Sequence, residues 1–296
     1  MIQKSLVKKI ILGSAQFGSK YGITNKFGAT QSNEIKKILK ICKSKKIKFI
    51  DSAINYGNAE VKLGKNNLRD FSLITKIPPV PINKKDIKSW TLKIVKKTLK
   101  ILKKKNLYAI LVHNSSDLIG PQRKKLYEAM THLKKIGLVK KIGVSIYDFK
   151  IMKKIIKEFK IDIVQVPFNI LDRRIIDKKL LSLLQKKKIE IHARSIFLQG
   201  LLLSSKDTKY TRFEKWKKLW LKIDNYCEEN KTSILNLALN YVLSQKNIKR
   251  VVIGFDDSKQ LKIILANINN FKMKKNFNKL ISNNKLLINP NNWKKI

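Results

Sequence analysis

Cysteine, histidine and long apolar runs are all scarce in this chain of 296 residues. The two cysteines, Cys42 and Cys227, fit no metal-binding or redox spacing, so we expect a reduced, cytoplasmic protein. No apolar run approaches the ~18 residues that a membrane-spanning helix requires. The basic N-terminus "MIQKSLVKKIILGSAQFG" resembles a weak signal peptide, but its apolar part reads better as a first strand and its loop. We therefore predict neither a membrane protein nor a secreted one.

Acidic residues are also few, with 20 against 66 basic residues, which gives a formal net charge of +46. Only seven of the basic residues are Arg, whereas nucleic-acid binders usually concentrate basic residues on one face and use Arg for bidentate contacts. Here Lys is spread over nearly every predicted helix, as expected of a codon bias towards A and T. The open alternative is attraction to acidic partners or anionic substrates through the long-range field. Nonspecific adhesion to nucleic acid at low salt is expected in both cases, and we predict no specific nucleic-acid partner.

No linker rich in Pro, Gly or Ser divides the chain, and strand-like runs alternate with amphipathic helical segments throughout. Eight runs are predicted as strands: residues 10–13, 48–51, 73–76, 109–113, 141–145, 163–167, 190–194 and 250–253. This alternation predicts a single (β/α)8 TIM barrel, with eight parallel strands ringed by helices, over residues 1–296. Two segments exceed ordinary connections: residues 201–216, and a C-terminal tail at 271–296.

A doubly wound Rossmann sheet is the alternative to the barrel. The glycines of "LGSAQFGSKYG" do not form G-x-G-x-x-G, and no ribose-binding acid follows at the usual offset, so we reject it. The last helix of the predicted barrel begins with a capping-box pattern, Asp257 followed by Gln260. Its apolar positions share one face: Leu261, Ile264, Leu265 and Ile268.

Four residues with complementary chemistry stand at or near predicted strand ends. Asp51, Lys76 and His113 close the strings "FID", "LITK" and "LVH", and Tyr56 follows Asp51 by five residues. The carboxyl ends of barrel strands meet at one rim, so we expect these side chains to gather there. Each has an ordinary structural explanation alone, such as a helix cap for Asp51. Their joint occurrence carries the prediction of a site.

This set suits the protonation of a carbonyl oxygen. A phenol is a poor acid near neutral pH, and a nearby ammonium stabilises its phenolate, the part we expect Lys76 to play for Tyr56. Asp51 would hold Lys76 in position, and His113 would donate a hydrogen bond to the carbonyl oxygen. The set lacks a nucleophile of the Ser/His/Asp kind and any metal-ligand spacing, so we predict no metal. A nicotinamide must bring the hydride, because no side chain can supply one.

These strings resemble those of the aldo-keto reductases, a family of single-barrel NAD(P)H enzymes. The resemblance covers nearly the whole chain, in the family's order and spacing, through "LGSAQFG", "LITK", "LVHN", "VQVPFNILDRR" and "ARSIFLQGLLL". It is most specific in "FIDSAINYGNAE", where Asp51 and Tyr56 keep the separation of the family's acid and tyrosine. The resemblance implies Tyr56 as general acid, Lys76 and Asp51 as its tuning pair, and His113 as the group that orients the carbonyl.

The resemblance also implies a coenzyme site, with departures from the family pattern. Ser145 and Gln165 match the positions that hold the nicotinamide carboxamide, but the Asn that usually follows the Ser is Ile146 here. The aromatic residue that usually stacks on the nicotinamide falls at Arg194, so either its guanidinium or Phe197 would take that place. The loop that usually lines the pyrophosphate contains Ser195, Phe197 and Gln199.

The string "VVIGFDDSKQLKIILAN" leaves the coenzyme preference open. It contains Gly254 and places Gln260 where the family commonly has a cation for the 2′-phosphate of NADP(H). The carboxylates of Asp256 and Asp257 would disfavour that phosphate, and the two lysines of the string would counter them. The resemblance to the family predicts NADP(H) as the coenzyme, and the residues of this segment predict NAD(H) almost as strongly.

We therefore expect a cytoplasmic oxidoreductase that transfers a hydride between NAD(P)(H) and a small-molecule carbonyl or alcohol: an aldehyde, a ketone or a sugar. The strings "GSAQFGSKYG", "RSIFLQGLLL" and "NPNNW" resemble a bacterial branch often associated with surface-sugar biosynthesis. The alternative is a catalytically weak, cofactor-binding barrel that acts as a sensor or partner-binding subunit. Ile146 and Arg194 favour that alternative, whereas the complete set of four catalytic residues argues against it.

Overall fold

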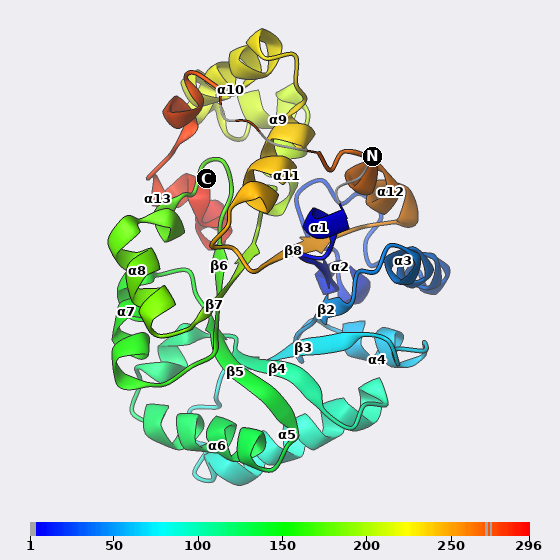
Figure 1. Ribbon diagram of the computed structural model, residues 1–296, viewed down its shortest axis with the longest axis vertical. Coiled ribbons are helices and arrows are strands. Elements are labelled where there is room, and N and C mark those ends of the chain that lie inside the picture. Colours follow the sequence, from blue (N-terminus) through cyan, green and yellow to red (C-terminus); the bar gives the residue numbers. More distant parts are fainter. Residues whose placement is uncertain (1–3, 270–271, 273) are drawn as a thin grey trace.

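A computed structural model describes residues 4–269, 272 and 274–296 and shows eight parallel strands in a closed barrel (Figure 1). The strands follow one another in chain order: β1 (Ile10–Gly13), β2 (Phe49–Asp51), β3 (Ser72–Ile77), β4 (Leu107–Val112), β5 (Val139–Ser145), β6 (Ile163–Pro167), β7 (Glu190–Arg194) and β8 (Arg250–Gly254). Pairing of β1 with β8, in register at Gly13 and Gly254, closes the ring. The predicted TIM barrel is confirmed, and its strands lie within two residues of the expected bounds.

Helices surround this ring, as Figure 1 shows. The α-helices are α1 (Lys4–Val7), α2 (Ala15–Gly18), α3 (Ser32–Ser44), α4 (Ala59–Gly64), α5 (Ile87–Leu102), α6 (Arg123–Lys135), α7 (Phe149–Glu158), α8 (Lys178–Lys186), α9 (Lys206–Tyr210), α10 (Lys217–Glu229), α11 (Ile234–Ser244), α12 (Ser258–Ala266) and α13 (Lys285–Ile288). Short 3-10 helices are η1 (Ser115–Leu118), η2 (Arg174–Ile176), η3 (Leu198–Leu203), η4 (Glu214–Trp216), η5 (Phe277–Leu280) and η6 (Pro290–Lys295). Within the described part of the chain, every helix is too short or too polar to span a bilayer.

Helix α7 shows how a lysine-rich sequence still builds a core. Met152, Ile155 and Ile156 are fully buried on one face, at a stabilisation of roughly 1.5–3 kcal/mol per side chain. Lys153 and Lys154 lie on the opposite, exposed face. Helical periodicity therefore places the lysines in water and the apolar residues in the core.

The start of α12 departs from the predicted capping box. The Asp257 carboxylate caps the helix as expected, because its Oδ1 accepts a hydrogen bond from the Gln260 backbone N–H at 2.7 Å. The Gln260 side chain instead turns to Asp256, with Oε1 accepting from the Asp256 N–H at 3.0 Å. The first hydrogen bond of the capping box is therefore present, and the second is made with Asp256, one residue before the expected Asp257.

The long segment after β7 carries η3, α9 and η4, and it contacts the C-terminal segment. Arg212 Nη2 donates to the Trp293 carbonyl at 3.3 Å, and Arg173, after β6, donates to the Phe277 carbonyl at 3.0 Å. The predicted tail begins at residue 271; residues 271 and 273 lie outside the described part of the chain. Its described part thus packs on loops at the carboxyl ends of β6 and β7.

A second group of polar side chains, here called the basal cluster, lies within the first three residues of four strands. Its members are Tyr108, Lys141, Glu190, His192 and Arg250. Glu190 lies at the centre, since it pairs with Lys141 Nζ at 2.6 Å and accepts from Tyr108 Oη at 3.2 Å. His192 is fully buried and lies 3.3 Å from the same carboxylate. The basal cluster therefore forms an ionic network at the amino ends of the strands.

Candidate active site

Lys76 is the hub of the site at the carboxyl ends of the strands. It is the fifth residue of β3, and its side chain is only 1% exposed. Its Nζ donates three hydrogen bonds: to Asp51 Oδ1 at 2.5 Å, to the Ser52 carbonyl at 2.8 Å and to Tyr56 Oη at 3.3 Å. The three donors of the ammonium are thus all used, as a buried charge requires.

Asp51 provides the counter-charge to this ammonium. Parallel pairing of β2 with β3 places Asp51 opposite Ile74, two residues before Lys76. The second carboxylate oxygen, Oδ2, accepts from Gln165 Nε2 at 2.7 Å, so β6 also holds the acid. Burial alone would lower the pKa of Lys76, but Asp51 and Tyr56 raise that pKa above its usual value. Lys76 is therefore a permanent cation in the site.

Tyr56 lies on a tight turn that follows β2. The turn is closed by a hydrogen bond from the Tyr56 N–H to the Ala53 carbonyl at 3.0 Å. Gly18, at the end of α2, packs directly on the Tyr56 backbone, and a Cβ at Gly18 would lie 1.7 Å from the Tyr56 carbonyl oxygen. Only glycine allows this close approach. The approach fixes the turn that presents the phenol to Lys76.

His113 follows β4 directly and packs edge-on against Tyr56, with ring centroids 5.6 Å apart. Its Nδ1 lies 2.8 Å from Oδ1 of Asn55, the residue before Tyr56. Burial, together with the charges of Lys76 and Arg194, lowers the pKa of His113 to about 4. The imidazole is therefore neutral around pH 7.

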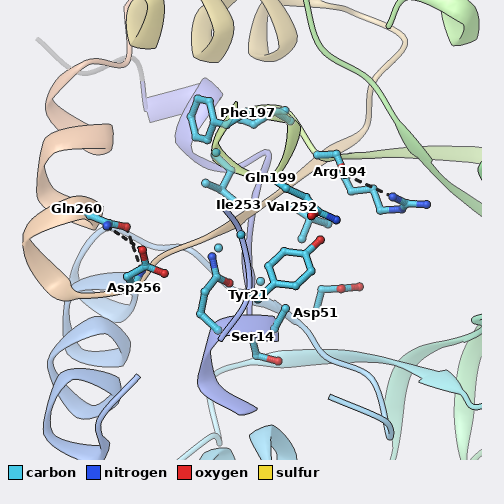
Figure 2. A pocket seen from close by; sticks show the side chains of 18 of the residues that line it. Ser14, Tyr21, Asp51, Arg194, Phe197, Gln199, Val252, Ile253, Asp256 and Gln260 are labelled. Carbon is cyan, nitrogen blue, oxygen red and sulfur yellow. Dashed lines mark hydrogen bonds between the residues drawn. The ribbon is translucent and has the colours of Figure 1, made fainter. Parts of the chain in front are cut away.

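A groove of about 920 Å³, including its open mouth, has Tyr56 among its lining residues. Figure 2 shows part of its wall. Ten of the thirteen predicted site residues line it: Asp51, Tyr56, Gln165, Arg194, Ser195, Phe197, Gln199, Gly254, Asp256 and Gln260. The other three lie close by, with Lys76 bonded to Tyr56, His113 packed on its ring, and Ser145 paired with Gln165 between β5 and β6. Figure 2 shows Asp51 and Arg194 on one side of the groove and Asp256 and Gln260 on the other. The structure thus brings together residues that the sequence places far apart.

Arg194 enters the groove from the end of β7. Its guanidinium carbon lies 3.8 Å from the centre of the Tyr147 ring, and its Nη2 donates to the Ile146 carbonyl at 3.2 Å. Its Nε is buried and has no hydrogen-bond partner. The buried Ser14 Oγ, also in the groove wall, likewise has none. A polar ligand would satisfy both atoms.

A segment over residues 19–31, here called the strap, connects the end of α2 to the start of α3 and is hydrogen-bonded to two other loops. The Ile23 N–H donates to the Gln199 carbonyl at 2.9 Å, and Asn25 Nδ2 donates to Asp256 Oδ1 at 3.1 Å. Tyr21, on the strap, lines the groove, and burial together with the neighbouring phenols raises its pKa, which keeps its hydroxyl protonated.

Sequence reasoning missed the strap residues, Asn55 beside His113, and Gln16, which lines the groove. The position of Gln16 and Tyr21 after the first predicted strand could have identified them, because loops at the carboxyl ends of barrel strands form the active sites. Among the residues described, no group of three His, Cys, Asp or Glu side chains is placed to hold a metal ion.

Comparison with known proteins gives a consistent picture. Residues 9–283 match the model of the aldo/keto reductase family. The fold is similar to that of the aldo-keto reductase AKR11C1 from Bacillus halodurans in its holo form, with 21% identity, 92% and 90% of the two chains covered, and a TM-score of 0.70. It is also similar to the glycerol dehydrogenase AKR11B4 from Gluconobacter oxydans, with 18% identity, 92% and 89% coverage, and a TM-score of 0.68. No curated protein sequence matches this chain.

Proposed function

Because the chain belongs to the aldo/keto reductase family, which makes it an oxidoreductase, we propose that it transfers a hydride between NAD(P)(H) and a small-molecule carbonyl or alcohol, with Tyr56 as the general acid and base. One observation carries this assignment. The Tyr56 hydroxyl accepts a hydrogen bond from the buried ammonium of Lys76 at 3.3 Å, and Tyr56 is one of the residues that line the groove. A phenol that accepts from an ammonium keeps its own O–H free to donate to a substrate.

The proton step follows from this arrangement. As a hydride reaches the carbonyl carbon, the Tyr56 O–H donates its proton to the carbonyl oxygen and becomes a phenolate. The Lys76 ammonium stabilises that phenolate in the dry interior, where such an interaction is stronger than in water. Asp51 keeps Lys76 in place, and Gln165 keeps Asp51 in place. In the reverse direction the phenolate accepts the proton from an alcohol.

His113 and Asn55 place a neutral imidazole beside the reacting oxygen. Because the pKa of His113 is lowered to about 4, its ring carries no charge that would repel Lys76 near pH 7. In this proposal Nδ1 donates to Asn55 Oδ1, so the neutral ring presents an unprotonated Nε2 to the substrate and orients an alcohol by accepting its O–H. Tyr56, Lys76 and Asp51 keep in this proposal the roles that the family resemblance implies, whereas His113, with its Nδ1–H engaged by Asn55, accepts a hydrogen bond instead of donating one.

The residues of the groove fit a nicotinamide coenzyme, which when bound would supply the hydride. Gln165 uses one N–H on Asp51 and keeps a second N–H and its Oε1 for a carboxamide, beside Ser145. The unpartnered Ser14 Oγ and Arg194 Nε offer further polar contacts. Ser195, Phe197 and Gln199 would line the pyrophosphate, and Gly254, Asp256 and Gln260 the remainder.

The substrate in this proposal is a small aldehyde, ketone or sugar-derived carbonyl, and the protein is cytoplasmic. The sugar assignment draws its support from the strings shared with the branch associated with surface sugars. The second candidate, a cofactor-binding sensor, draws support from the buried, apolar Ile146 in place of the usual Asn. Binding of NADH or NADPH without turnover of a panel of aldehydes and sugars would favour the sensor.

The decisive experiment compares Tyr56→Phe with Tyr108→Phe. Loss of the Tyr56 hydroxyl removes the proton donor, and we expect turnover to fall by about 10³-fold or more while coenzyme binding, followed by tryptophan fluorescence, is kept. Tyr108 lies in the basal cluster, so its variant should keep full turnover. Normal activity in Tyr56→Phe would refute the assignment of the proton donor.

A further inference from the structure

Asp256 lies on the opposite side of the groove from Asp51 and Arg194 (Figure 2). If the reacting ring of a coenzyme lies within reach of Tyr56, the rest of the dinucleotide must follow the groove towards the end of β8 and the residues beyond it. Gly254, Asp256 and Gln260 line this part of the groove. We infer that Asp256 makes this site selective for NAD(H) over NADP(H), because its fixed carboxylate accepts the adenosine ribose hydroxyls and repels a 2′-phosphate. This inference rests on the proposed function and deepens it.

Two side-chain amides hold the Asp256 carboxylate in place. Oδ1 accepts from Asn25 Nδ2, and Oδ2 accepts from Gln260 Nε2, both at 3.1 Å. Asn25 is only 3% exposed, and its own Oδ1 accepts the backbone N–H groups of Phe27 and Gly28 at 3.1 and 2.8 Å. Gln260 is tied back by the Asp256 N–H. The carboxylate is therefore oriented before any ligand arrives, and each oxygen can still accept one hydrogen bond from a ribose hydroxyl.

Asp256 is not held by an ion pair in the described part of the chain. None of the ion pairs among the described residues includes Asp256. The side chain at the position where the family commonly has a cation is the neutral Gln260, whose amide is already engaged with Asp256. Lys259 and Lys262 are exposed to water. A phosphate dianion placed beside this carboxylate would meet direct repulsion and would bring no hydrogen-bond donor.

Asp256 could instead have a purely structural role, through its hydrogen bond to Asn25 of the strap. In that case Asp256 would only fasten Asn25, and its charge would not affect coenzyme choice. Asp256→Asn separates the two roles, because an amide keeps an oxygen that can accept from Asn25 but removes the charge. Asp257→Asn is the matched control, since it removes the neighbouring charge, keeps a good helix cap and alters no residue of the groove wall.

The experiment measures the dissociation constants of NADH and NADPH for the whole protein and both variants, by tryptophan fluorescence quenching and calorimetry. For the unaltered protein we expect NADH to bind about tenfold or more tightly than NADPH. Asp256→Asn should abolish most of that preference, chiefly by tightening NADPH, and Asp257→Asn should keep it. Adding Gln260→Arg to Asp256→Asn should reverse the preference.

Salt makes the outcomes distinguishable. The net charge of +46 attracts the more negative NADPH at long range, and this effect fades as ionic strength rises, whereas the short-range effect of Asp256 persists. NADPH binding as tightly as NADH at physiological salt, or an unchanged preference in Asp256→Asn, would overturn the inference and leave the proposed function standing. Failure of both nucleotides to bind would overturn the proposed function and the inference with it.

Discussion

The two ends of the barrel contain the same five functional groups: a carboxylate, an ammonium, a phenol, an imidazole and a guanidinium. At the carboxyl ends of the strands they come from Asp51, Lys76, Tyr56, His113 and Arg194. At the amino ends they come from Glu190, Lys141, Tyr108, His192 and Arg250. Residue types alone therefore do not distinguish the candidate active site from the basal cluster.

The difference lies in which group is the hub. In the basal cluster the carboxylate of Glu190 is the hub, and Tyr108 donates its O–H to it. At the other end the ammonium of Lys76 is the hub, and Tyr56 accepts from it. The first phenol has its proton bound to an acid, whereas the second keeps its proton for a ligand. The proton of Tyr108 is thus held within the basal cluster, whereas the proton of Tyr56 is available for the proposed proton transfer.

The largest expected effect comes from removing each ammonium in turn. Lys76→Met leaves Asp51 buried without its cation, so we expect about 3–5 kcal/mol of lost stability and a fall in turnover of about 10²-fold or more. Lys141 is partly exposed, so Lys141→Met should cost about 1 kcal/mol or less and leave turnover unchanged. Denaturant unfolding and turnover assays check both. Equal effects of the two substitutions would end the distinction between the two ends.

A smaller effect is expected at the acidic hub. Burial opposes ionisation of Glu190, but hydrogen bonds from His192 and Lys141 outweigh it and lower its pKa to about 2. This stability is present above the ordinary pKa of about 4.3 and is lost as pH falls towards 2. With a discount for partial exposure, we expect Glu190→Gln to cost about 1–2 kcal/mol at pH 7. The difference from the unaltered protein, measured by denaturant unfolding, should shrink between pH 4.3 and 2; a constant difference would contradict it.

The smallest effect concerns His113. Its pKa is lowered to about 4 in the folded protein. As pH falls, His113 of the unfolded chain is therefore protonated near pH 6.5, whereas His113 of the folded chain is protonated only near pH 4. His113 therefore reduces stability as pH falls through this range and adds no step to the activity profile between pH 6 and 8. With three histidines in the chain, proton NMR can follow each ring, and His113→Gln identifies its signal. Titration of that signal near pH 6.5 would contradict the shift.

The sequence was sufficient to predict the barrel because a buried parallel strand is a short, nearly continuous apolar run. The run before Asp51 and the run around Lys76 made the strand ends clear, and the site followed from them. Asn25 could not be found in the same way, since its role depends on a contact with Asp256 across 231 positions of the chain. The same holds for Asn55, whose contact with His113 depends on the path of a loop. Local pattern predicts elements, whereas loop contacts depend on the assembled fold.

The pairing of β1 with β8 also constrains how the protein is made. During synthesis on a ribosome, Asp51 and Lys76 emerge early and on neighbouring strands, so their ion pair can form before most of the chain exists. The part of the site beside Gly13 and Gly254 can form only after the final strand has been translated, because these two residues pair with each other across β1 and β8. A chaperone acting on the nascent chain would therefore meet first the half of the candidate site proposed to donate the proton, and last the half proposed to hold the adenosine.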